Sequence, residues 1–297
     1  MKGIINSYIH SFMHFYSLIK KSRSLLFFLL LAFISQIFFG YKIYDSIVLS
    51  VGYSIGLFIF ISIAYSIVYS QASTTIQTEK INHKRYQCFV IIGAILLNFF
   101  ILSGQFSKDT FLFKLSKPIR HFFFESVGVL HFNPTITSII VNNITAVILP
   151  LSLLLLVKAR LSKNVFNKEH IRILTGLFLL YLPVIIFSGK SLYQVLSYLP
   201  VYLFLAAIPE EILYRGLLQT RLESVLQNPV NAIVLSSFIF GLMHLPINIK
   251  MYGNLMGFAG CIGNNAFGGL FIGYLYYKTR SIWVVILFHL ISGVALS

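Results

Sequence analysis

Two adjacent carboxylates, Glu210 and Glu211, lie in the apolar stretch Ile208–Gly216 of a chain that has only eight acidic residues. A charged side chain in a membrane-spanning helix costs on the order of 2.5–3.5 kcal/mol on insertion scales, so such residues usually have a function. An i,i+4 ion pair between Glu211 and Arg215 would give one of the two carboxylates a structural role. It leaves Glu210 unexplained, and we therefore expect Glu210 to do chemistry.

Two of the eight histidines, His244 and His289, also lie within apolar runs. A single membrane histidine is usually a hydrogen bond between helices. The helix-stop signal at Gln227 lies 17 residues after Glu210 and 17 residues before His244. In an antiparallel pair of helices with a rise of 1.5 Å per residue, equal offsets bring both side chains to the same depth.

The depth of His289 follows from the positively charged helix boundaries. Glu210 lies 11 residues from Arg221, and His289 lies 11 residues from Lys278. Glu210, His244 and His289 are therefore predicted to share a layer roughly 15 Å inside the cytoplasmic boundary, by helix rise.

A glutamate and two histidines in one layer could activate water for hydrolysis in two ways. The carboxylate can act as a general base with an imidazole orienting the water or stabilising an oxyanion. The same three side chains could hold zinc, which lowers the pKa of bound water to about 7. The chain has no His-Glu-x-x-His motif, no Gly-x-Ser-x-Gly motif and no pair of membrane aspartates. We therefore expect no cofactor and leave a zinc ion at Glu210, His244 and His289 as the alternative.

The composition is that of an integral membrane protein, with 57% hydrophobic and 10% charged residues. Soluble domains have about 25% charged residues. The net charge of +15 comes from Lys and Arg in short loops between apolar runs, which suits anionic lipid headgroups. No nucleic-acid-binding module is recognisable, so we expect the lipid bilayer to be a partner and nucleic acid not to be one.

The apolar runs predict an all-α polytopic bundle of about eight or nine spanning helices, at about 20 residues per crossing. The runs lie at about 24–43, 46–70, 87–106, 134–157, 173–189, 195–221, 232–250, 252–277 and 281–297. The basic loops 71–86 and 158–172 predict a multi-pass topology with a cytoplasmic N-terminus. Segment 107–133 does not fit this scheme, and we expect an interfacial or re-entrant helix there.

Three regions are predicted along the chain. Residues 1–23 form an amphipathic N-terminal segment on the inner membrane face. Residues 24–190 form N-terminal transmembrane helices. Residues 191–297 form the reactive core, because Glu210, Glu211, His244 and His289 lie inside apolar runs there.

The ordered set of polar motifs resembles the CAAX-protease and bacteriocin-processing (CPBP/Abi) family of intramembrane glutamic-type proteases. The matching features are Glu210-Glu211-x-x-x-Arg215, Phe240-x-x-x-His244, the segment Phe271–Trp283 and His289. The resemblance covers about residues 192–297. It implies an intramembrane endopeptidase that cleaves a membrane-embedded or lipidated protein or peptide in a plasma membrane, most simply that of a prokaryote.

The resemblance also implies a role for each residue. Glu210 would be the general base and His244 its partner in activating water, without a metal. His289 would stabilise the oxyanion, with Phe240 in support. Glu211 and Arg215 would position the helix.

One position departs from the family pattern. The family usually has Asn or Asp four residues after the last histidine as a second oxyanion donor, whereas this chain has Gly293 preceded by Ser292. Losing one such donor typically costs about 10²–10³ in rate. Asn264 or Asn265 could substitute, although such residues more often bridge helices. The departure keeps a second interpretation open, in which a slow or inactive relative acts as a membrane scaffold or regulator.

Overall fold

The computed structural model describes residues 2–72, 83–102, 111–156 and 167–296, and every regular element in these ranges is helical. Seven helices are long and apolar enough to cross a membrane, or eight if the bent pair Pro229–Met243 and Leu245–Tyr252 is one span. The last apolar helix is shorter. Each of the nine predicted apolar runs is largely helical where it is described, so the all-α membrane bundle is confirmed.

In chain order, the helices are α1 (Lys2–Lys21), α2 (Arg23–Tyr44), α3 (Ile47–Gln71), α4 (Lys84–Leu102), α5 (Phe111–Gly128), α6 (Pro134–Asn143), η2 (Ile144–Ile148), α7 (Leu149–Leu156), α8 (Lys168–Phe187), α9 (Leu192–Tyr202), η3 (Leu203–Ala207), α10 (Ile208–Glu211), η4 (Ile212–Gln219), α11 (Thr220–Leu226), α12 (Pro229–Met243), α13 (Leu245–Tyr252), α14 (Asn254–Gly260), η5 (Cys261–Ala266), α15 (Phe267–Thr279) and α16 (Ile282–Leu296). The elements labelled η are π-helical and continue the α-helices around them.

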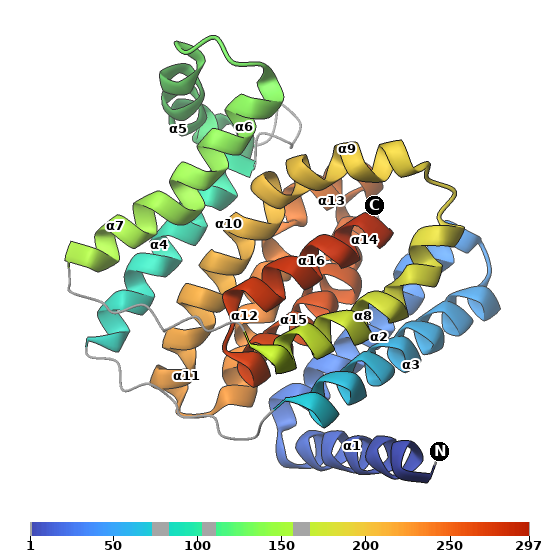
Figure 1. Cartoon of the computed structure of the whole chain (residues 1–297). Coiled ribbons are helices and arrows are strands. Elements are labelled where there is room, and N and C mark those ends of the chain that lie inside the picture. The colour runs from blue at the N-terminus through green and yellow to red at the C-terminus, as the bar shows by residue number, and fades with distance from the viewer. Residues whose placement is uncertain (1, 73–82, 103–110, 157–166, 297) are drawn as a thin grey trace.

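The C-terminal helices α12, α15 and α16 occupy the middle of the molecule (Figure 1). Helices α2, α3 and α8 flank them on one side, and α4, α6 and α7 lie on the other side beyond α10 and α11. The predicted N-terminal amphipathic segment is the helix α1, which lies across one end of α2 and α3. Helix α5 lies next to α4 and α6 and is not among the candidate spans, as expected for segment 107–133 where it is described.

Turn residues end the helices where the sequence predicts. Asp45 takes the left-handed conformation after α2, and the Ser46 side chain caps α3. Gln227 is likewise left-handed after α11, and the Asn228 side chain accepts a hydrogen bond from the backbone of Asn231 at 3.1 Å. The antiparallel packing of α12 on α11 and η4, which continue α10, is therefore encoded locally.

Glycines allow the α14–η5–α15 span to pack against its neighbours. A Cβ on Gly257 would lie 2.6 Å from the backbone nitrogen of Ile249, and one on Gly263 would lie 2.9 Å from that of Gln36. Gly268 faces open space. Close helix approach through small residues is a general feature of membrane bundles, and here it fixes the helix that covers the polar cluster.

Candidate active site

Glu210 and Glu211 face different surroundings because consecutive helical residues point about 100° apart. The Glu211 side chain is fully buried between helices. The Glu210 side chain is 23% exposed and lines a cavity. Both belong to α10, a single α-helical turn between the π-helical segments η3 and η4. π-Helical turns are frequent at functional sites, and here they set the direction of both carboxylates.

One carboxylate oxygen of Glu211 accepts hydrogen bonds from two side chains, Arg215 and His289. Arg215 donates from Nη1 to Glu211 Oε1 at 3.2 Å, as the i,i+4 spacing predicts. His289 donates from Nδ1 to the same oxygen at 2.6 Å. Arg215 also donates to the Gly269 carbonyl at 3.2 Å and lies over the Phe240 ring at 4.4 Å. Helices α10, α15 and α16 are therefore tied together at this point.

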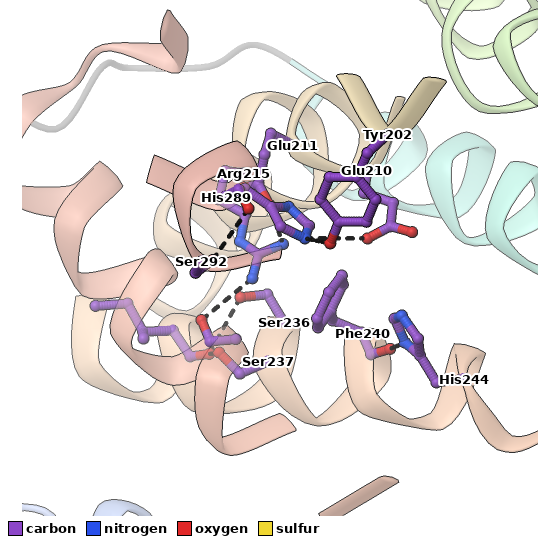
Figure 2. Close-up of polar contacts among 12 residues, drawn as sticks. Tyr202, Glu210, Glu211, Arg215, Ser236, Ser237, Phe240, His244, His289 and Ser292 are labelled. Carbon is purple, nitrogen blue, oxygen red and sulfur yellow. Dashed lines mark hydrogen bonds and ion pairs between the residues drawn. The ribbon is translucent and has the colours of Figure 1, made fainter. Parts of the chain in front are cut away.

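The second ring nitrogen of His289 faces Tyr202 and Glu210 (Figure 2). Nε2 lies 3.0 Å from the Tyr202 hydroxyl and 3.9 Å from Glu210 Oε2. The Glu211 carboxylate accepts a hydrogen bond from Nδ1 and thereby fixes the orientation of the imidazole. A carboxylate orients the histidine of a catalytic dyad in the same way. The structure thus brings Glu210 and His289 together at one depth.

His244 lies at the junction of α12 and α13, where the span bends by 49°. Its Nδ1 lies 2.9 Å from the Phe240 carbonyl, four residues earlier. A carbonyl only accepts, so this contact places a proton on Nδ1, and Nε2 of the neutral ring is an acceptor. The apolar run at 232–250 predicts one unbroken helix instead. The bend follows from Pro246, which lacks a backbone N–H and disfavours a continuous helix before it.

Glu210 and His244 line the same cavity of about 530 Å³. Tyr202, Tyr214 and Asn265 contribute polar groups, and apolar side chains such as Leu213 and Met243 line much of the rest. The Oε2 atom of Glu210 is buried and has no hydrogen-bond partner. Buried polar atoms are nearly always hydrogen-bonded, so this oxygen is placed to accept a hydrogen bond from a water or a substrate group in the cavity.

Most of the remaining predicted residues contact other parts of the protein. Ser292 donates to the backbone carbonyl of His289 at 3.0 Å, within its own helix. Asn265 lines the cavity and accepts from Asn248 at 2.8 Å, so it bridges helices as expected. Asn264 has a buried side-chain oxygen without a partner. Phe240 packs its ring against Arg215 and both histidines.

The alternative of a zinc site does not fit this geometry. Among the described residues, no group of three His, Cys, Asp or Glu side chains converges closely enough to hold a metal ion. Both ring nitrogens of His289 already have partners, Glu211 and Tyr202. We therefore derive no step through a metal.

Two features of the site were missed by sequence reasoning. The first is the bond from His289 to Glu211, because the helical spacing pairs Glu211 only with Arg215. The second is Tyr202, eight residues before Glu210. In a regular α-helix, residues eight apart point about 80° away from each other. The extra residue in η3 corrects this difference, and no sequence signal for that π-helical turn was recognised.

Residues 191–294 match the family model described as Type II CAAX prenyl endopeptidase Rce1-like. This part of the chain is an Rce1-like domain. The match confirms, over this part of the chain, the resemblance inferred from the motifs, and the matched family is a peptidase family. No significant match was found among curated proteins or among solved structures. The Rce1-like domain begins just before α9 and ends within α16, so it contains every candidate site residue.

Proposed function

We propose that this chain is an intramembrane endopeptidase that hydrolyses a peptide bond with water activated by Glu210. The observation that carries the proposal is the Glu210 carboxylate, whose buried Oε2 atom accepts no hydrogen bond and which borders a cavity shared with His244. The multi-pass bundle and the match to an endopeptidase family support the same conclusion. The substrate is then a membrane-embedded or lipidated protein or peptide.

The proposed reaction is a direct attack of water on the scissile carbonyl. Glu210 takes a proton from a water in the cavity, and the hydroxide oxygen bonds to the carbonyl carbon. The carbonyl π electrons move onto oxygen and form a tetrahedral oxyanion. Collapse of the intermediate breaks the C–N bond, and the departing amine takes the proton from Glu210. Water is consumed, and the carboxyl and amino products separate.

His244 would orient the attacking water. Its Nδ1–H is committed to the Phe240 carbonyl, so Nε2 can accept a hydrogen bond from water. A water held between the His244 nitrogen and the Glu210 carboxylate has both of its protons directed, which exposes its lone pairs to an electrophile. The Glu211–His289 pair would organise the opposite side of the site, where negative charge develops on the substrate oxygen.

The cavity suits a substrate that arrives from the membrane. Most of its lining is apolar, and Glu210 and His244 are among its polar residues. An extended apolar peptide or a lipid-modified segment can replace lipid contacts along such a lining, while water is confined to the polar end. The outer wall comes from residues before the Rce1-like domain, including Val141 and Ala146.

The test is cleavage of membrane peptides by the purified full chain in nanodiscs. Matched peptide libraries with and without a prenyl group on a C-terminal cysteine would be compared by mass spectrometry. Glu210→Gln should lower the rate by about 10²–10⁴, the usual contribution of a general base. Glu169→Gln, at the start of α8, is the control and should cleave at the wild-type rate.

Two further results decide between mechanisms. Cleavage that persists with a strong chelator supports a metal-free water, and loss of cleavage that zinc restores would overturn that part of the proposal. A folded wild-type protein that cleaves neither library would contradict the protease and favour the scaffold. In that case, Glu210→Gln should also leave any binding of partner proteins unchanged.

A further inference from the structure

We infer that Tyr202 supplies the oxyanion hydrogen bond that no side chain at position 293 can supply. The inference rests on the proposed function, because it assigns a group to the tetrahedral intermediate of that reaction. It follows from three observations: the space around Gly293, the partner of the Tyr202 hydroxyl, and the place of Tyr202 in the cavity lining.

The ring of Tyr202 occupies the space that a side chain at 293 would need. A Cβ built on Gly293 would overlap Cε1 and Cζ of the Tyr202 ring and lie 2.6 Å from its hydroxyl oxygen. Real Cβ atoms essentially never approach other atoms so closely. Glycine at 293 and tyrosine at 202 are therefore a matched pair, since either a side chain at 293 or this ring can be present.

Tyr202 connects the cavity to His289. Tyr202 and Glu210 both line the 530 Å³ cavity, whereas His289 is buried behind them. The hydroxyl lies 3.0 Å from His289 Nε2, and Figure 2 shows the tyrosine, the histidine and Glu210 directed toward one another. His289 thus acts on the cavity through Tyr202.

The protons available on His289 and Tyr202 allow the Tyr202 hydroxyl to donate a hydrogen bond into the cavity. With both ring nitrogens protonated, His289 donates from Nδ1 to Glu211 and from Nε2 to the Tyr202 oxygen. The single phenolic proton is then free for the substrate oxyanion. The formal charges of Glu210, Glu211, Arg215 and the protonated His289 sum to zero, which is the balance that a low-dielectric site favours.

Neighbouring rings hold Tyr202 in place before substrate binds. Tyr198 stacks on it with centroids 5.3 Å apart, and the His289 ring meets it edge-on at 5.6 Å. Because the donor is fixed in advance, it needs no reorganisation when the oxyanion forms. Tyr202 also lies on the same continuous helical run as Glu210, so base and donor are positioned by one element.

The first experiment removes only the hydroxyl. Tyr202→Phe should lower kcat by about 10²–10³ with little change in KM, as for loss of one oxyanion-hole donor. Tyr193→Phe, at an exposed position of the same helix, is the matched control and should retain the wild-type kcat. A merely structural hydroxyl would instead change thermal stability, or change kcat and KM together.

The second experiment exchanges the two partners. Tyr202→Ala should lose activity, and Gly293→Asn alone should lose it because the side chain collides with the ring. In the double variant Tyr202→Ala/Gly293→Asn, the amide can reach the place of the hydroxyl, so kcat should rise at least tenfold above that of Tyr202→Ala. Tyr202→Ala/Gly293→Leu fills the same space without a donor and should give no such rise.

Each outcome separates this inference from the proposed function. Tyr202→Phe with the wild-type kcat, in a protein whose cleavage still requires Glu210, overturns the role of Tyr202 alone. Equal rescue by Asn and Leu at 293 also overturns it, because space and not hydrogen bonding would then be restored. A wild-type protein that cleaves no substrate overturns the inference and the proposed function together.

Discussion

The adjacent residues Glu210 and Glu211 differ in burial and in hydrogen bonding. Glu211 is fully buried and bonds to Arg215 and His289 through one oxygen, whereas Glu210 is 23% exposed, borders a cavity and lies 3.9 Å from His289 Nε2. Removing one partner from a buried ion pair leaves the other charge uncompensated and is strongly destabilising. Removing the charge of the partly exposed Glu210, whose contact with His289 Nε2 is 3.9 Å long, has a smaller cost, and replacing a functional residue often stabilises a protein.

The two glutamine variants are therefore expected to behave differently. Glu211→Gln should lower the free energy of unfolding by about 3–5 kcal/mol, because Arg215 and His289 lose their carboxylate. Glu210→Gln should leave it unchanged or raise it while abolishing cleavage. Thermal denaturation in a single detergent, beside the cleavage assay, measures both. Equal stability of the two variants would contradict the division of roles.

At the scale of elements, α6 completes the hydrogen bonding of the helix that carries Glu210. Pro209 has no backbone N–H, so carbonyls about one turn earlier lose a donor. Asn142 donates to the Leu205 carbonyl at 2.5 Å, and Asn143 donates to the Phe204 carbonyl at 2.7 Å. The opened backbone of η3 is thus satisfied from a neighbouring helix, which is the usual condition for a proline within a span.

Asn142 should consequently be a positioning residue for Glu210. Asn142→Leu removes the donor to Leu205 and should cost about 0.6–2 kcal/mol of stability, the range for hydrogen bonds between membrane helices. It should also lower kcat more than KM, because α10 loses its fixed orientation.

Pro209→Ala provides the control for Asn142, since it restores a backbone N–H near the Leu205 carbonyl. In the Pro209→Ala background, the stability cost of Asn142→Leu should shrink. Additive costs in the double variant would show that the asparagine does not compensate for the proline.

At the scale of the whole molecule, polar contacts between helix ends gather at one end of the bundle. Lys84 at the start of α4 donates to the Ser224 carbonyl in α11. Arg221 donates to Gln87 at 3.2 Å, and Arg280 pairs with Glu223 at 2.6 Å. Cationic helix ends on one side are typical of the cytoplasmic face, so we propose that this end is cytoplasmic, together with the N-terminus.

Cysteine labelling of α8 tests this orientation, because the helix crosses from Lys168 to Phe187. In a background with the buried Cys88 and Cys261 replaced by alanine, Ser188→Cys should react with a membrane-impermeant maleimide on intact cells. Lys168→Cys should react only after the membrane is opened. The reverse pattern would invert the proposed topology.

The sequence by itself determined the class of fold and most of the candidate site. Apolar runs of sufficient length require helices in lipid, because the backbone must satisfy its own hydrogen bonds there. The cost of burying charge singled out Glu210 and Glu211, and counting residues from helix ends predicted a common depth for Glu210 and His289. These inferences use only local chemistry and the helical rise.

Tertiary structure decided which way the side chains point and what they meet. The π-helical turn in η3 rotates Tyr202 toward Glu210, and the ring of Tyr202 accounts for glycine at 293. The bend after α12 presents His244 to a cavity whose wall comes partly from residues outside the Rce1-like domain. These features depend on packing between segments far apart in sequence. A single extra residue in a helical turn changes the direction of a side chain with little effect on its depth in the membrane.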